Sequence, residues 1–253
     1  MFKFIKQKEN MLLGLSGIIV VIILWQTVAA YKLIDPILLS SPIDVFNESI
    51  SLFKTGEIYP DLIASISEFL IGFLLALFLG FIFGFILGWF KKTRAVFNPL
   101  LFGLYATPII AILPLIILWF GFGLFAKVSI VFLSSFFPIL ISIMESAKNT
   151  DQNLLKLARS FKASEFNIIT AIIIPNSIPG IVSGIKIAMP RGIIGMIIAE
   201  FFTGNAGLGY LISYYGSTFQ TAKLLAIVIL IAGASVVFTA VIDLLEKKVK
   251  YNN

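Results

Sequence analysis

The sequence predicts an all-helical membrane protein with six transmembrane helices, and three observations support that fold class. Of the 253 residues, 59% are hydrophobic and 13% are charged, and the mean hydropathy is +1.03. Soluble domains are nearer to half apolar and a quarter charged. Six segments also reach the roughly 20 apolar residues that a helix needs to cross a bilayer core. Those segments are too uniformly apolar to alternate as the strands of a membrane barrel do.

We expect the six spans to form a single transmembrane domain over residues 1–253. The third and fourth spans are separated only by a short turn around Gly121 and Gly123, and the fifth is the least apolar because it carries charges. The predicted spans lie near residues 11–31, 66–90, 98–120, 125–144, 177–200 and 223–244.

The distribution of positive charge predicts the orientation of the spans. Most of the 19 Lys and Arg residues lie at the two termini, in the loop after the second span and in the loop after the fourth. The first loop on the opposite side, over residues 32–65, is acidic. Because cytoplasmic loops carry an excess of Lys and Arg, both termini and the 145–176 loop are predicted to be cytoplasmic.

Composition also excludes several kinds of chemistry. The chain has no Cys and no His, so it cannot form disulfides. It also has no thiolate or imidazole group that could bind a metal or act as a nucleophile or a base. The glycine-rich stretch over residues 204–209 lacks the Gly-Lys-Ser/Thr ending of a phosphate-binding loop. A net charge of +6, dispersed along the chain, gives no sign of nucleic-acid binding. We therefore predict no catalytic residue, no metal site and no cofactor bound by this chain.

The segment from Asp151 to Gly180 is polar and basic, although long apolar segments flank it. Leu154, Leu157, Ala158 and Phe161 fall at helical spacing on one face. Two interpretations remain open on physical grounds. The apolar face docks on a cytoplasmic protein, or the helix lies on anionic lipid, because both use an apolar face with basic neighbours.

The same segment contains signals for two short helices. Thr150 or Asp151 is predicted to cap the first helix, and Ser164 the second. Pro175 is predicted to end the second helix, since the residue before a proline is pushed away from helical geometry. The fifth span would then begin near Ser177.

Two features of the predicted spans suggest specific roles. Charges within a span are costly and usually face protein or water, so Lys186, Arg191 and Glu200 are candidates for a translocation path or a gate. The alternative is that they anchor the helix near its ends. Small residues that recur every four positions let another helix approach closely, and the second span has five of them: Gly72, Ala76, Gly80, Gly84 and Gly88.

The 151–180 segment resembles the cytoplasmic loop of ABC importer permeases of type I, which depend on a solute-binding protein. That family's motif is Glu-Ala-Ala, three residues, Gly, nine residues and Ile-x-Leu-Pro. It stands here as Lys156-Leu157-Ala158, then Lys162, then Ile172–Pro175. Further similarity to the nitrate, sulfonate and taurine branch lies at Ser41-Pro42, 107–115, 119–123, Ala199-Glu200 and 207–210.

The resemblance implies a type I importer permease fold in which the 145–176 loop couples to an ATPase. Two positions depart from the motif, because Lys156 replaces its Glu and Lys162 its Gly. Glycine there suits a left-handed turn, so Lys162 either takes another conformation or tolerates strain. The residues implied in coupling are Leu154, Leu157, Ala158, Arg159, Ser160, Phe161, Lys162, Ala163, Ser164 and Pro175.

The resemblance further implies a multi-pass protein of a prokaryotic plasma (inner) membrane. Its partners would be a second permease copy in a homodimer, two cytoplasmic ATPase subunits that bind ATP and Mg, and an extracytoplasmic solute-binding protein. The expected solute is a small oxyanion of the sulfonate, taurine or nitrate type. Within the same importer class, the alternative solute is a vitamin precursor such as a thiamine pyrimidine or riboflavin. An ion-gradient-driven secondary transporter is the other alternative, although we see neither the repeats nor the mid-membrane carboxylates typical of that class.

Overall fold

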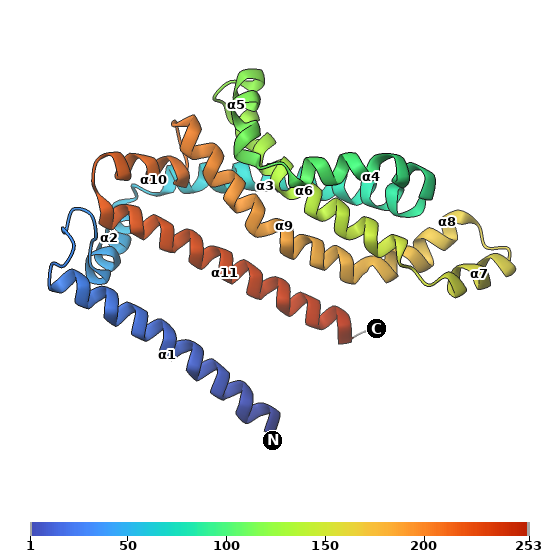
Figure 1. The fold of residues 1–253 in the computed structure, drawn as a ribbon, viewed down its shortest axis with the longest axis horizontal. Helices are drawn as coiled ribbons and strands as arrows, with labels where there is room; N and C mark the ends of the chain where they lie inside the picture. The colour runs from blue at the N-terminus through green and yellow to red at the C-terminus, as the bar shows by residue number, and fades with distance from the viewer. Residues whose placement is uncertain (1, 252–253) are drawn as a thin grey trace. The chain divides into compact units, whose positions relative to one another are not determined.

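The computed structural model describes residues 2–251, with side chains described over 13–246 except at positions 15 and 245. The terminal lysines that support the predicted orientation lie outside the described side chains. No strand occurs between residues 2 and 251, and helices follow one another along the chain (Figure 1). They are α1 (Phe2–Ala30), α2 (Pro42–Thr55), α3 (Tyr59–Trp89), α4 (Lys91–Ala106), α5 (Ile109–Phe120), α6 (Leu124–Lys148), α7 (Gln152–Ser160), α8 (Glu165–Ile168), the π-helical turn η1 (Ile169–Ile173), α9 (Ile174–Thr203), α10 (Leu208–Ser217) and α11 (Thr221–Tyr251).

The helices form two compact units. The first contains Met1–Tyr59 with Leu211–Ile231, and the second contains Pro60–Tyr210 with Ala232–Asn253. Helices α3, α10 and α11 therefore each contribute residues to both units.

In the first unit, polar contacts connect segments that are far apart in sequence. Helix α2 begins with a capping box, in which Ser41 Oγ accepts from the Asp44 amide and the Asp44 carboxylate accepts from the Ser41 amide. Beyond α2, Glu57 Oε1 accepts a 2.9 Å hydrogen bond from the Tyr215 hydroxyl, and Lys223 Nζ lies 3.2 Å from Glu57 Oε2. The Tyr215 hydrogen bond, together with the Lys223 charge, holds the pKa of Glu57 below its ordinary value of 4.5.

In the second unit, the small residues of α3 bring that helix against α6 of the same chain. A Cβ added at Gly72 would lie 2.7 Å from the Val131 Cβ, and one added at Gly88 would lie 2.5 Å from the Ala147 Cβ. Gly80 and Gly84 meet α6 in the same way, and Ala76 is fully buried. The sequence left open which helix this stripe would face, and the structure shows that it is α6.

The second helix that packs against α6 is α9, and its glycines also face α6. A Cβ at Gly184 would lie 2.9 Å from the Ser142 Cβ, and one at Gly195 would lie 2.9 Å from the Ser134 Cβ. Because small residues let helix backbones approach closely, α6 packs at short distance against both α3 and α9.

Four helices of the described chain are long and apolar enough to cross a membrane: Tyr59–Trp89, Leu124–Lys148, Glu165–Thr203 and Thr221–Leu244. A fifth crossing is formed if α4 and α5 count as one span, although they meet at a bend of 95°. The segment predicted as one span near 98–120 is thus divided at Thr107, whose ψ of 125° is extended because Pro108 follows it. The apolar part of α1, Ser16–Ala30, is shorter.

The prediction that Pro175 ends a helix was wrong. The helix that begins at Glu165 continues through the π-helical turn η1 into α9, where Pro175 occupies the first turn. Proline is tolerated in the first turn of an α-helix, and a wider π-helical turn just before it changes the hydrogen-bond ladder that proline would otherwise break.

We predict that Gly84→Ala destabilises the protein by about 1–3 kcal/mol, because the new methyl group would lie 2.8 Å from the Ile143 Cβ. Gly103→Ala, on α4, is the matched control, since a Cβ added at Gly103 would have no neighbour within 4 Å. There the gain in helix propensity should leave stability unchanged or raised by up to about 1 kcal/mol. Thermal unfolding of both variants in detergent would measure this, and equal effects would contradict the close contact between α3 and α6.

Candidate functional site

The coupling candidate is built on α7 and the turn that follows it. Asp151 caps α7 by accepting a 2.8 Å hydrogen bond from the Asn153 amide, and Ser164 caps α8 by accepting a 3.2 Å bond from the Asn167 amide. Between the two helices, the Ala163 amide donates to the Ala158 carbonyl and the Lys162 amide to the Arg159 carbonyl. These two bonds form a Schellman motif, which sets the direction in which the chain leaves α7.

Lys162 adopts the left-handed conformation that the family motif assigns to glycine. Its φ is +56°, one of three positive φ values at non-glycine residues in the described chain. The first alternative, another conformation, is therefore excluded. A side chain with a Cβ is strained in this region, and only the hydrogen bonds of the motif hold it there.

One apolar residue of α7 is buried inside the protein, and the other large ones on and after this helix are exposed. Leu155, which the sequence analysis did not single out, is buried against Ala147, Ile168 and Ile173 and fixes α7 to the adjoining helices. Its signal was its spacing of three residues from Ala158, which places it at the edge of the face we had assigned. In contrast, the other large apolar side chains are exposed: Leu154 by 43%, Leu157 by 54%, Phe161 by 78% and Phe166, on α8, by 73%. We call these four residues the coupling patch.

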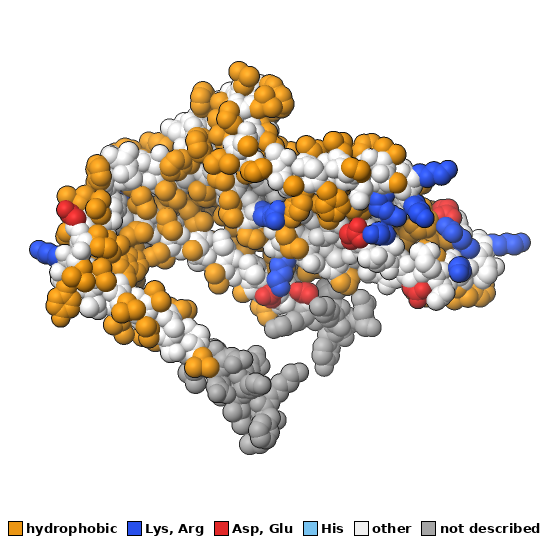
Figure 2. Space-filling view, viewed as in Figure 1, with side chains coloured by type: hydrophobic (Ala, Val, Ile, Leu, Met, Phe, Trp, Pro, Cys, Tyr) orange, Lys and Arg blue, Asp and Glu red, His pale blue; other side chains and the backbone are white. Residues whose placement is uncertain are grey.

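Basic side chains surround α7 and α8. Arg159 lies 3.5 Å from Glu165 and its guanidinium stands 5.8 Å from the centre of the Trp89 ring, at the end of α3. Figure 2 shows Lys and Arg side chains gathered around these helices. The remaining predicted coupling residues, Ser160, Ala163 and Pro175, lie at the end of α7, in the Schellman turn and in the first turn of α9.

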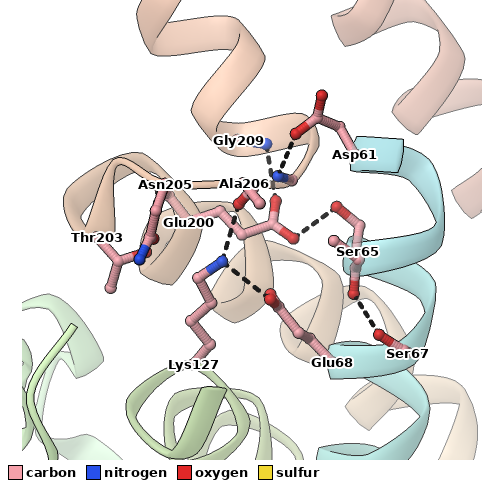
Figure 3. A network of polar contacts seen from close by, with 12 residues as sticks. Asp61, Ser65, Ser67, Glu68, Lys127, Glu200, Thr203, Asn205, Ala206 and Gly209 are labelled. Atoms are coloured by element: carbon pink, nitrogen blue, oxygen red, sulfur yellow. Dashed lines mark hydrogen bonds and ion pairs between the residues drawn. The ribbon is translucent and has the colours of Figure 1, made fainter. Parts of the chain in front are cut away.

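At the other end of α9, Glu200 is fully buried in a polar network (Figure 3). Its carboxylate accepts a 2.5 Å hydrogen bond from Ser65 Oγ and a 2.7 Å bond from the Gly209 amide. The loop over 204–209 is thereby tied to α9 and α3. The Gly207 amide adds a 2.7 Å bond to Asp61.

The same network holds a buried ion pair that the sequence analysis missed. Lys127 Nζ lies 2.9 Å from Glu68 Oε1 and donates a 2.8 Å bond to the Ala206 carbonyl, and both charged side chains are at least 94% buried. A lone acid and a lone base near the ends of two neighbouring apolar segments were the signal that could have found this pair.

Gly207 explains why this loop is rich in glycine. Its φ is +111°, a conformation that residues with a side chain rarely adopt. A Cβ at this position would also lie 2.3 Å from the Glu200 Cδ. The glycines therefore let the loop backbone close over the carboxylate, and they have no phosphate-binding geometry.

The structure does not bring Lys186, Arg191 and Glu200 together. Lys186 pairs with Asp243 of α11 and lies 3.6 Å from Glu246. Arg191 is exposed on α9, and its guanidinium stands 4.7 Å from the centre of the Tyr105 ring. It borders a cavity of about 450 Å³ beside the bend between α4 and α5. Of the three charges, Arg191 is the one that faces an open space.

No group of three or more acidic side chains that could hold a metal ion occurs in the part of the chain that the structure describes.

Comparison with protein families finds one that matches most of the chain. The family of the binding-protein-dependent transport system inner membrane component matches residues 76–251. A putative aliphatic sulfonates transport permease protein of Bacillus subtilis (strain 168) is 29% identical, and the match covers 98% of this chain and 90% of the relative. The corresponding Escherichia coli (strain K12) protein is 33% identical over 84% of this chain and 81% of its own. A formylaminopyrimidine transport permease protein of Halalkalibacterium halodurans is 27% identical over 76% of each chain.

Among solved structures, the chain is similar to one of the inward-facing conformations of the MetNI methionine ABC transporter. The TM-score is 0.63 at 17% sequence identity, over 75% of this chain and 96% of the other. At that identity the likeness concerns the fold, and it confirms the predicted all-helical fold class.

We predict that Lys162→Gly stabilises the protein by about 1 kcal/mol, because glycine adopts the left-handed conformation without strain. Lys156→Gly is the matched control: the same substitution in the interior of α7 should destabilise the helix by roughly 1 kcal/mol. Thermal unfolding and proteolysis at α7 would report both. A Lys162→Gly protein that is less stable than the unchanged protein would contradict the Schellman turn described above.

Proposed function

The chain belongs to the family of inner membrane components of binding-protein-dependent transport systems, and from that premise we propose that it carries a small aliphatic sulfonate across the membrane. The family places it as the permease subunit of an ABC importer, and ATP is hydrolysed by a separate subunit. The observation that supports the solute most directly is the sulfonate relative that matches 98% of this chain.

The coupling patch is, in our proposal, where the ATPase subunit docks. Large apolar side chains exposed on α7 and at the start of α8 suit a helix-in-groove contact. The contact is mechanically connected to the spans, because Leu155 joins α7 to residues of α6, α8 and η1. A push on α7 would therefore reach α6 directly, and α9 through η1, which precedes it in the chain. Such a route fits a rigid-body change of access driven by ATP.

The proposed assembly contains two copies of this permease, two ATPase subunits and an extracytoplasmic binding protein. ATP and Mg belong to the ATPase subunits in this scheme. Both termini and the 145–176 segment would face the cytoplasm, and the 32–65 and 201–222 segments would face outward. The basic side chains around α7 and α8 support that orientation. All six predicted spans would belong to one transmembrane domain.

A sulfonate is favoured over the alternative solutes because two of the relatives described above have names that specify sulfonates. Because the name of one relative specifies formylaminopyrimidine, a vitamin precursor remains the alternative solute within the same importer class. A secondary transporter driven by an ion gradient has no support from these relatives.

We predict that a strain lacking this gene loses uptake of alkanesulfonates and regains it when the gene is restored. Uptake of taurine, nitrate, riboflavin and a thiamine pyrimidine precursor should be compared in the same strains. A defect restricted to the pyrimidine precursor or riboflavin would contradict the sulfonate and leave the importer class standing. Uptake that survives inactivation of the ATPase but stops when the ion gradient collapses would contradict the importer itself.

We also predict that Phe161→Ala weakens assembly with the ATPase by roughly 2 kcal/mol, because Phe161 is the most exposed side chain of the coupling patch. Phe161→Asp should uncouple ATP hydrolysis from transport while membrane insertion is retained. Lys156→Gln on the same helix is the control and should leave assembly unchanged. If removing basic charge weakens function more than either Phe161 change does, α7 lies on lipid instead.

A further inference from the structure

Arg191 differs from the other cations of α6 and α9. Lys148, at the end of α6, pairs with Glu145. Lys127 pairs with Glu68, and Lys186 pairs with Asp243 and Glu246. For Arg191, the described residues provide no carboxylate within ion-pair distance. Its position in the middle of α9, Ile174–Thr203, makes an unpaired charge costly in a membrane.

The Tyr105 ring compensates only part of that cost. The guanidinium carbon stands 4.7 Å from the ring centre, which is a favourable cation–π distance. A ring face accepts none of the five guanidinium N–H groups in a conventional hydrogen bond. No acceptor for the Arg191 side chain occurs among the residues whose side chains are described. The donors of Arg191 are therefore free to bind an anion.

The space beside Arg191 has a polar end and an apolar wall. The cavity measures about 450 Å³, within the range of small-ligand pockets, and lies where the α4–α5 bend meets α6 and α9. Ser134 also lines it, and the buried Ser134 Oγ has no hydrogen-bond partner among the described residues. The apolar lining includes Ile109, Ile112, Leu133, Phe137 and Ile194.

We propose that this cavity is a solute subsite in the membrane, in which Arg191 binds the sulfonate group and the apolar wall holds the alkyl chain. The inference rests on the proposed function and names the place where the solute is held during transport. The planar guanidinium donates pairs of hydrogen bonds to a tetrahedral oxyanion, and an alkyl chain gains by leaving water. The bend at Thr107 and Pro108 places residues of α4 and α5 along one side of the cavity, where they form part of the apolar wall near Arg191.

The lining also sets which sulfonates fit. The cavity is lined by no carboxylate, so an ammonium group on the solute would find no counter-charge there. The subsite therefore favours alkanesulfonates over taurine, which carries an ammonium group, and it disfavours cationic solutes through repulsion by Arg191.

The test uses the permease with its ATPase and binding protein in proteoliposomes, with labelled pentanesulfonate as the probe. Arg191→Gln should lower the maximal uptake rate at least tenfold, with assembly and basal ATP hydrolysis retained. Arg191→Lys should recover part of that loss, because it restores the charge without the planar fork. The concentration of loaded binding protein that gives half-maximal uptake should stay the same, since binding-protein docking is a separate step.

A chain-length series supplies a second, independent measurement. Ile194→Trp would fill part of the cavity, so uptake of octanesulfonate should fall much more than uptake of methanesulfonate. Leu118→Trp is the control, because Leu118 is 78% exposed on α5 and does not line the cavity. That variant should keep the unchanged protein's chain-length profile.

The outcomes separate the subsite from the function on which it rests. If the unchanged protein imports no sulfonate, the proposed function fails. If it imports sulfonates while Arg191→Gln and Ile194→Trp leave both rate and chain-length profile unchanged, the subsite is wrong and the function stands. If Arg191→Gln breaks the permease dimer, its uptake rate no longer tests the subsite. The chain-length profile of Ile194→Trp then becomes the deciding measurement. An unchanged profile would then show that Arg191 pairs with a second copy of the chain.

Discussion

The close approach of α6 to two glycine-bearing helices is the constraint on which the rest of the second unit depends. Gly72, Gly80, Gly84 and Gly88 on α3 and Gly184 and Gly195 on α9 leave no room for a side chain against α6. In lipid, apolar burial gives little preference for one helix pairing over another, so packing at short distance carries the specificity. The contact also places Lys127, in the first turn of α6, beside Glu68 of α3.

Two distant regions are thereby connected through the same helices. The α7 end of the unit meets α6, α8 and η1 through the cluster around Leu155. The Glu200 network meets α9, α3 and α6 at the other end of α9. Arg191 lies on α9 between these regions, beside the cavity. Helix α9 thus contributes to both the proposed subsite and the network that closes over the 204–209 loop, and η1 connects it to the cluster beneath α7.

The sequence was sufficient for properties that depend on local spacing. Helix caps at Asp151 and Ser164 followed from residue type and position, and the small-residue stripe on α3 followed from its four-residue repeat. The sequence was insufficient wherever a distant partner decides. Leu155 is one of several apolar residues in its segment, and its burial depends on Ile168 and Ile173. Lys127 is buried by contacts with Glu68 and Ala206, which lie far from it in the sequence. Pro175 misled us because a local rule for proline ignored the π-helical turn that precedes it. Helix α2 was also missed, although Ser41, Pro42 and Asp44 carry a capping signal.

The buried ion pair also has a consequence for how the protein is made. Glu68 belongs to α3 and Lys127 to α6, and 59 residues separate them, so the acid leaves the ribosome well before its partner. A carboxylate released alone into lipid would be unsatisfied until Lys127 arrived. Synthesis therefore favours keeping α3 beside the insertion machinery, in its protein and water surroundings, until α6 has been made. Once α6 has followed, Lys127 pairs with Glu68, so we expect the two helices to enter the lipid together as a pair.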